Sequence, residues 1–469
     1  MMSDASEIRV ALGALERAEH HRPGQAVKLA DVYTATSHRS ALDPERGLVV
    51  GNRGMGKSFW VHALRNPEIR AFAAKEFRFP ALATADVVVG FNGSDRLDGI
   101  APTAGMVAEA DAGGHEVALW QAVLARAVAP YCGMALPPSY ADLVRWVQAD
   151  AERIARLLTQ ADDVLQQQGK RLLLLFDALD LLSSDWQTCR RRVSGLLQLV
   201  LKAYSFRAIR TKVFLRLDQF HDQPVFRFSD GSKVRTAAVH LRWSDEDLYR
   251  LLFYRLRGCP AFVRLQTETQ DGRPDWIARL VRFLSGTYMG SGPTRGFVET
   301  WLPTHLADAA DQISPRTFLT AWREAARHGP CPSKTAVDHH GILEGVRKAS
   351  EDRLAEIEQD YPWVPVALSP LRGESVPLPQ EDLLQIWRRE QTVPRAIATA
   401  TERGRPILIE KDADQSTPEA ALLNALGFIG VVEVRRTGKV DIPDIFRVQA
   451  HIKRRGGVKP PRRGDPSSS

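Results

Sequence analysis

An eight-residue loop gives the most specific chemical signal in this sequence. Gly51 to Ser58 read G-N-R-G-M-G-K-S and match the pattern G-x-x-x-x-G-K-[ST] at every specified position. In such a loop, glycines let backbone N–H groups turn toward anionic oxygens, Lys57 reaches the β- and γ-phosphates, and Ser58 ligates a metal ion. We therefore predict a nucleoside-triphosphate site, with ATP and Mg²⁺ as the expected cofactors. The predicted cofactor-binding residues are Gly51, Asn52, Arg53, Gly54, Met55, Gly56, Lys57, Ser58 and Phe59.

The segments on either side of the loop fit this chemistry. The apolar run 48–50 predicts a buried strand before the loop, and residues 57–65 predict a helix that ends before Asn66-Pro67. The positive N-terminal end of that helix would face the bound phosphates.

A second chemically informative residue, Asp177, follows the apolar run 171–176. A run this short, ended by an acid, predicts a central parallel strand that is buried on both faces. Open α/β sheets bind ligands at the carboxyl ends of their strands. We therefore expect Asp177 to act with Lys57 in catalysis and to share the metal ion with Ser58.

The residue after Asp177 is Ala178, not the glutamate that many ATPases use to polarise the attacking water. Asp180 is the candidate substitute, because it stands three positions beyond the acid that ends the strand. The same carboxylate would also serve as a helix cap or as a partner for a group behind the site. Because of Ala178, we expect hydrolysis to be slow.

The composition is that of a soluble globular protein with two or three domains. The 469 residues are 44% hydrophobic and 25% charged, which suffices for a sizeable core. No apolar stretch approaches the roughly twenty residues of a membrane span, and the N-terminus lacks the regions of a signal peptide. We expect a cytoplasmic protein with no membrane partner. The four cysteines form no C-x-x-C pair, which argues against a disulfide framework or a zinc site.

The positive charge is concentrated near the C-terminus. The chain has a formal net charge of +7, and six basic residues with no acid lie between Lys453 and Arg463. The rest of the chain is therefore nearly neutral. This Gly- and Pro-containing tail is not expected to fold alone. It is the part of the chain through which DNA or a protein partner would be bound.

Five short apolar runs alternate with helical segments along the first half of the chain. This alternation predicts a doubly wound parallel sheet. The predicted strands are 48–50, 86–91, 171–176, 212–217 and 237–241, and the helices between them include 106–130, 139–168 and 186–204.

Helices 274–283, 297–310 and 315–328 follow the last strand and predict a small bundle. From about residue 40 to 330, the chain resembles the AAA+ and STAND branch of P-loop ATPases: a phosphate loop, an apolar strand ending in Asp, a polar residue on the next strand, and a helical lid with an arginine near a helix start. STAND switches carry a D-x-h-D pattern, which Asp177 to Asp180 resembles.

This resemblance implies roles for two arginines. Arg316, in Ser314-Pro315-Arg316, matches the second sensor, which reaches back to the γ-phosphate. Arg216, at the end of the strand after that of Asp177, looks like the first sensor, although it would also pair with Asp218. An arginine finger acting on another subunit would come from the loop that bears Arg227 and Arg235. The alternative is that both arginines are solvated surface charges.

The last third of the chain resembles a winged-helix domain. Helices at 341–359, 381–389 and 417–426 precede a hairpin formed by 431–434 and 439–442, with a basic turn that contains Gly438. Helix 417–426 contains no Lys or Arg, so it is poorly suited to phosphate contacts. The expected role of the domain is therefore intramolecular, with the wing and tail left for nucleic acid or a partner.

Together these features predict an α/β protein: a doubly wound parallel P-loop NTPase sheet with a helical lid and a C-terminal winged-helix-like domain. The expected parts are an N-terminal helical segment (1–40), the nucleotide-binding domain (41–243), the lid (244–330), a helical linker with the winged-helix-like domain (331–450) and a basic disordered tail (451–469).

The predicted function is that of an ATP-binding and ATP-hydrolysing molecular switch. The resemblance implies a setting in prokaryotic defence or stress signalling, with a protein partner or a homo-oligomer as the target. The alternative is a DNA-binding AAA+ loader or remodelling ATPase that uses the winged helix and basic tail. A scaffold that binds ATP without turning it over is a third reading, which Ala178 allows.

Overall fold

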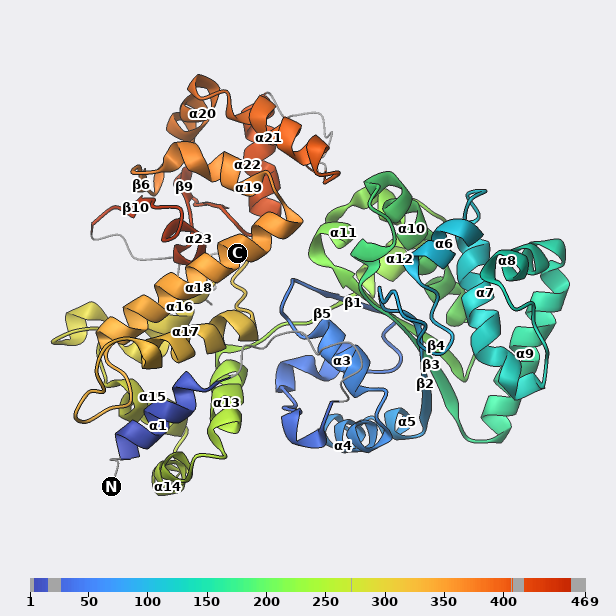
Figure 1. The fold of residues 1–469 in the computed structure, drawn as a ribbon, viewed down its shortest axis with the longest axis horizontal. Coiled ribbons are helices and arrows are strands. Elements are labelled where there is room, and N and C mark those ends of the chain that lie inside the picture. Colours follow the sequence, from blue (N-terminus) through green and yellow to red (C-terminus); the bar gives the residue numbers. More distant parts are fainter. Residues whose placement is uncertain (1–3, 16–26, 271, 406, 408–416, 457–469) are drawn as a thin grey trace. The chain divides into compact units, whose positions relative to one another are not determined.

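A computed structural model describes residues 4–15, 27–270, 272–405, 407 and 417–456. These residues form two compact units (Figure 1). The first contains the described residues of His20–Arg242, and the second joins those of Met1–Glu19 to those of Trp243–Ser469.

The first unit is built on a five-stranded sheet in which every pairing is parallel. The strand order is β2-β3-β4-β1-β5, so the predicted parallel α/β sheet is confirmed. Because all strands run the same way, their carboxyl ends share one edge of the sheet. The strands are β1 (Leu48–Gly51), β2 (Ala85–Phe91), β3 (Arg171–Phe176), β4 (Ile209–Arg216) and β5 (Val239–His240).

Helices cover both faces of this sheet: α3 to α5 lie on one side, and α7 to α10 lie on the other (Figure 1). Two predicted helices are each interrupted. Segment 106–130 breaks after Ala110, and segment 139–168 breaks at Asp150, whose carboxylate accepts from the N–H of Arg153. The helices are α2 (Arg39–Leu42), α3 (Lys57–Ala63), α4 (Pro67–Phe77), α5 (Pro80–Ala83), α6 (Ala104–Ala110), α7 (Glu116–Val128), α8 (Tyr140–Ala149), α9 (Ala151–Gln167), α10 (Trp186–Ala203), α11 (Leu217–His221) and α12 (Gly231–Thr236).

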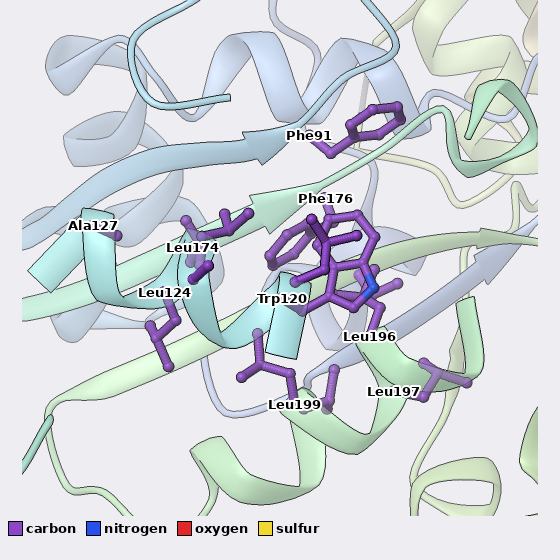
Figure 2. Close-up of a cluster of buried hydrophobic side chains, with 14 of the residues drawn as sticks. Phe91, Trp120, Leu124, Ala127, Leu174, Phe176, Leu196, Leu197 and Leu199 are labelled. Atoms are coloured by element: carbon purple, nitrogen blue, oxygen red, sulfur yellow. The ribbon is translucent and has the colours of Figure 1, made fainter. Parts of the chain in front are cut away.

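An aromatic cluster holds the carboxyl ends of β2 and β3 (Figure 2). Trp120 of α7 makes edge contacts with Phe91 and Phe176, at ring-centroid distances of 6.3 and 5.5 Å. Its indole N–H donates to the carbonyl of Arg192 at 2.7 Å. The N–H of Asp177 donates to the carbonyl of Phe91 at 2.9 Å. The core therefore fixes the position from which Asp177 leaves the sheet.

The second unit begins with a helical bundle. Its helices are α1 (Asp4–Gly13), α13 (Asp245–Leu256), α14 (Pro260–Thr269), α15 (Trp276–Ser285), α16 (Val298–Leu306), α17 (Pro315–Arg327) and α18 (His339–Asp360).

The N-terminal helix α1 belongs to this bundle, where it packs against α13, α14 and α17. Arg9 donates to the carbonyls of His328 and Gly329 at 2.7 Å, and Arg327 donates to the carbonyl of Gly13 at 3.0 Å. The predicted N-terminal helical segment (1–40) therefore contributes α1 to the second unit, whereas its described residues from 27 onward belong to the first.

The C-terminal part of the second unit combines short strands with helices. Strands β7, β9 and β8 form an antiparallel sheet, in which β8 and β9 are the expected hairpin. The elements are α19 (Val364–Leu368), β6 (Ser375–Val376), β7 (Leu378–Pro379), α20 (Gln380–Arg389), α21 (Thr392–Glu402), α22 (Pro418–Phe428), β8 (Glu433–Val434), β9 (Lys439–Asp441), α23 (Asp444–Arg447) and β10 (Lys453–Arg454).

The basic segment is folded at its beginning, contrary to the prediction of a disordered tail from residue 451. Lys453 and Arg454 form β10, which pairs in parallel with β6. Arg454 also bonds to Asp441 and Asp444 at 3.2 and 2.7 Å. Paired backbone groups and compensated charges explain why this part of the segment has a defined structure. Residues 457–469 of the predicted tail lie outside the described residues.

No helix in the described ranges has the length and apolar character needed to cross a membrane.

Candidate nucleotide site

The predicted phosphate loop connects β1 to α3. Gly54 and Gly56 have φ angles of 79° and 101°, in the left-handed region where a side chain is strained. A Cβ atom on Gly56 would meet nothing within 4 Å, so the backbone conformation rather than crowding requires glycine there. Gly56 precedes the first residue of α3, and its carbonyl accepts from the N–H of Trp60 at 3.1 Å. Glycines in this conformation allow neighbouring N–H groups to turn toward an anion.

Lys57 lies folded back over the start of the loop. Its Nζ donates to the carbonyls of Gly51 and Asn52 at 2.6 and 2.9 Å. Burial lowers the pKa of Lys57 to about 8, opposed mainly by the negative charge of Asp177. The positive charge of Arg216 lowers this pKa further. The charges of Asp180 and Asp218 also oppose the shift, so the ammonium group is a buried cation held next to the loop among three carboxylates.

Asp177 stands at the carboxyl end of β3 and is only 5% exposed. Burial raises the pKa of its carboxyl, while a hydrogen bond from the Ser58 hydroxyl and the charge of Lys57 oppose this shift. The tertiary structure thus brings together the three residues from which ATP and metal binding were predicted.

The donor set at this point fits Mg²⁺. Ser58 and Asp177 offer one hydroxyl and one carboxylate, and Mg²⁺ commonly uses one or two protein oxygens together with phosphate oxygens and water. Among the described residues, no cluster of three or more His, Cys, Asp or Glu side chains is arranged to hold a metal by itself. A metal ion here would therefore depend on the oxygens of the bound nucleotide.

Arg216 ends β4, directly opposite Gly51 of β1 in the strand register. Its Nε and Nη2 donate to the two carboxylate oxygens of Asp218 at 3.1 and 3.0 Å. Its Nη1 donates to Asp180 at 3.2 Å. The sequence allowed either a sensor role for Arg216 or a pairing with Asp218, and this pairing is present. The contact with Asp180 was not predicted. The sensor role of Arg216 stays a prediction.

Asp180 lies in a short 3₁₀ turn, Leu179–Leu181, that begins after Ala178. Ala178 has a φ of 54°, an uncommon left-handed conformation for a residue with a side chain. The N-cap of α10 is Asp185, whose carboxylate accepts from the N–H of Thr188 at 2.7 Å. Asp180 therefore does not cap α10, and its carboxylate faces Arg216. Its catalytic role remains a prediction.

Arg316 lies in the first turn of α17, as predicted, and bonds to a residue that the sequence did not single out. Its Nη1 donates to Oε1 of Glu356 on α18 at 2.5 Å. The other oxygen of Glu356 accepts from Arg353 at 3.3 Å. A sensor role for Arg316 stays a prediction.

The two candidate finger arginines differ in their surroundings. Arg227 is exposed. The guanidinium of Arg235 lies 5.6 and 5.7 Å from the ring centroids of Phe220 and Phe226. Arg235 thus has a packing role within its own unit, and a role of either arginine toward another subunit remains a prediction.

Comparisons with known proteins leave the family open. No family model and no curated protein matches this chain. Among solved structures, it is similar to the ORC2 protein of Aeropyrum pernix in ADPNP-ADP complexes, at 13% identity and a TM-score of 0.29, over 94% of this chain and 98% of that one. The ORC1 protein of Aeropyrum pernix in complex with DNA matches at 12% identity and a TM-score of 0.31, over 94% and 96%. Such values support no argument about the activity of this chain.

Proposed function

We propose that this protein is a Mg²⁺-dependent ATPase of the AAA+/STAND type that works as a nucleotide-controlled switch. The observation that supports this most is the meeting of Lys57, Ser58 and Asp177 beside a glycine loop with left-handed backbone angles. Each group has the chemistry that a bound triphosphate requires.

In this proposal, the Lys57 ammonium leaves the carbonyls of Gly51 and Asn52 and bonds to the β- and γ-phosphates. The loop N–H groups bond to phosphate oxygens, and the positive end of α3 adds to their effect. Ser58 and Asp177 would hold Mg²⁺, which would neutralise charge on the phosphate oxygens.

Asp180 is the proposed group that orients the attacking water. Arg216 holds this carboxylate in an ion pair, and the position after Asp177 is an alanine, so a slow reaction is part of the proposal. Slow turnover suits a switch, because the ATP-bound state then persists long enough to act on a partner.

The direct test is calorimetric titration of the full chain with ATP in the presence of Mg²⁺. Lys57→Ala should abolish binding or weaken it at least a hundredfold, because the phosphates lose a charge-assisted partner. The matched control is Lys233→Ala, which removes an exposed lysine paired with Asp230 in the same unit. Equal affinities for the parent and Lys57→Ala would refute the proposal.

A second candidate is a DNA-binding loader, which is favoured by the run of basic residues near the C-terminus. DNA binding by this basic segment is less favoured at Arg454, because Asp441 and Asp444 form ion pairs with it. Helix α22, which precedes the β8–β9 hairpin, contains no Lys or Arg. We therefore propose an intramolecular role for a winged-helix-like C-terminal part, and a protein partner or second copy as the target of the switch. The setting in prokaryotic defence or stress signalling rests on the family resemblance alone.

A further inference from the structure

The two acids that bond to Arg216 differ in how firmly they hold it. Asp218 binds the Nε and Nη2 edge through both carboxylate oxygens, whereas Asp180 binds only Nη1, at 3.2 Å. The side chains of Asp218 and Asp180 are 5% and 24% exposed. The contact with Asp218 is thus the better enclosed and the geometrically more specific of the two.

Asp218 is itself fixed by the backbone around it. Its Oδ1 accepts from the N–H of Gln219 at 2.9 Å, within α11. A carboxylate held in this way imposes a direction on the planar guanidinium group that it binds through two oxygens. Asp218 therefore constrains the direction of the guanidinium group more firmly than Asp180 does.

Arg216 also lies close to the phosphate loop. It pairs in register with Gly51, whose carbonyl accepts from Lys57. The charge of Arg216 is felt at the Lys57 ammonium, where it lowers the pKa. A phosphate that binds Lys57 would therefore enter the field of both cations.

From this arrangement we infer that Asp218 is a positioning residue that clamps one edge of Arg216, so that Nη1 exchanges its partner from Asp180 to a phosphate oxygen of a bound triphosphate. This inference rests on the proposed ATP site. The exchange frees Asp180 from its ion pair only when a triphosphate is present. Asp218 thereby contributes to the distinction between ATP and ADP without touching either nucleotide.

The test measures the affinities of the full chain for the non-hydrolysable β,γ-imido analogue of ATP and for ADP, both with Mg²⁺. Asp218→Asn keeps the side-chain shape and removes the charge that orients Arg216. We expect the affinity for the analogue to fall on the order of tenfold, with the affinity for ADP changed less than about twofold. Asp218→Glu keeps the charge but displaces it by one methylene, so we expect an intermediate ratio of the two affinities.

The matched control is Asp222→Asn. Asp222 belongs to a neighbouring buried ion pair, with Arg190 at 2.6 Å, and is 4% exposed. We expect this variant to keep the parent ratio of affinities. If it changes the ratio as much as Asp218→Asn does, general damage to this region explains the effect and the inference is wrong.

A double variant tests whether Asp218 acts through Arg216. Adding Asp218→Asn to Arg216→Ala should weaken binding of the analogue no further than Arg216→Ala alone. Additive losses, or an unchanged ratio in Asp218→Asn, would overturn the inference while leaving the ATP site intact. If the parent chain binds neither nucleotide, the proposed function fails and the inference fails with it.

Discussion

Burial raises the pKa of the Asp177 carboxyl and the Ser58 hydroxyl opposes this shift, although the two residues follow different strands, with β4 between those strands in the sheet. A hydroxyl and a carboxylate that influence each other in this way can share one small divalent cation. We therefore expect these two side chains to be the protein ligands of a metal ion bound with ATP.

Asp177→Ala should remove the Mg²⁺ dependence of ATP binding, because the remaining hydroxyl is a weak ligand by itself. ATP affinity measured with Mg²⁺ and with EDTA should differ in the parent and converge in the variant. Asp163→Ala, at an exposed position on α9, should retain the parent difference. A variant at position 177 that still responds fully to Mg²⁺ would show that this carboxylate does not hold the metal.

ATP affinity should weaken as the pH rises past the pKa of Lys57. Burial lowers that pKa to about 8 in the nucleotide-free protein, so the amine is charged below this pH and increasingly neutral above it. At pH 9, we expect binding to be about tenfold weaker than at pH 7 and to be accompanied by proton uptake. Calorimetry in two buffers of different ionisation enthalpy measures this uptake.

The control for this pH effect is Lys57→Arg, whose guanidinium stays charged throughout the range. Its affinity, whatever its absolute value, should vary little between pH 7 and pH 9. The same pH dependence in this variant and in the parent would assign the titration to another group.

Asp180→Asn should preserve ATP binding and slow hydrolysis by about a hundredfold, since only the orientation of the water is affected. Single-turnover hydrolysis with labelled ATP separates this step from binding and product release. Equal rates in the parent and the variant would leave Asp180 only its ion pair with Arg216.

Arg316→Ala should leave nucleotide binding intact but remove the conformational response of the second unit to the bound nucleotide. In the parent, we expect ATP to protect the segment between Leu241 and Pro330 from proteolysis better than ADP does, and the difference should vanish in the variant. The control Arg347→Ala removes a helical arginine paired with Glu344 on its own helix. Loss of the ATP–ADP difference in both variants would mean that Arg316 has no special role.

Strand β10 lies inside the basic segment, so truncations before and after this strand should have different effects on stability. Truncation after Ala450 would remove β10 and the bonds of Arg454 to Asp441 and Asp444, which keep Arg435 and Arg447 as partners, so we expect a loss of about 2 kcal/mol in stability. Truncation after Gly456 keeps this strand, so it should leave the melting temperature unchanged in thermal unfolding.

The truncation after Gly456 also distinguishes the switch hypothesis from the DNA-loader hypothesis. Three basic residues follow Gly456, so DNA binding through them would have a log–log salt slope near about −3. Under the switch proposal, anisotropy of a labelled duplex should show no appreciable binding at about 50 mM salt. Submicromolar binding at physiological salt that is lost on truncation after Gly456 would favour the loader instead.

Local patterns in the sequence predicted the residues of the candidate site and the elements that bear them. The glycine loop and the apolar run ending at Asp177 are recognisable because their chemistry is concentrated in a few consecutive residues. The predicted strands lie within a few residues of β1 to β5. A helix period or a short apolar run depends on neighbouring residues alone, so no knowledge of the fold is needed to detect it.

Only the tertiary structure decided which distant groups became partners. The order of the strands, the place of α1 in the second unit, and the pairing of Arg316 with Glu356 depend on contacts between segments far apart in the chain. A charged residue in a sequence carries no mark of the opposite charge that it will meet. Arg454 looked like part of a free basic tail for this reason, whereas in the fold two buried carboxylates bind it. The physical cause is that a buried charge must be compensated, and its compensating group is chosen by the packing of the whole unit.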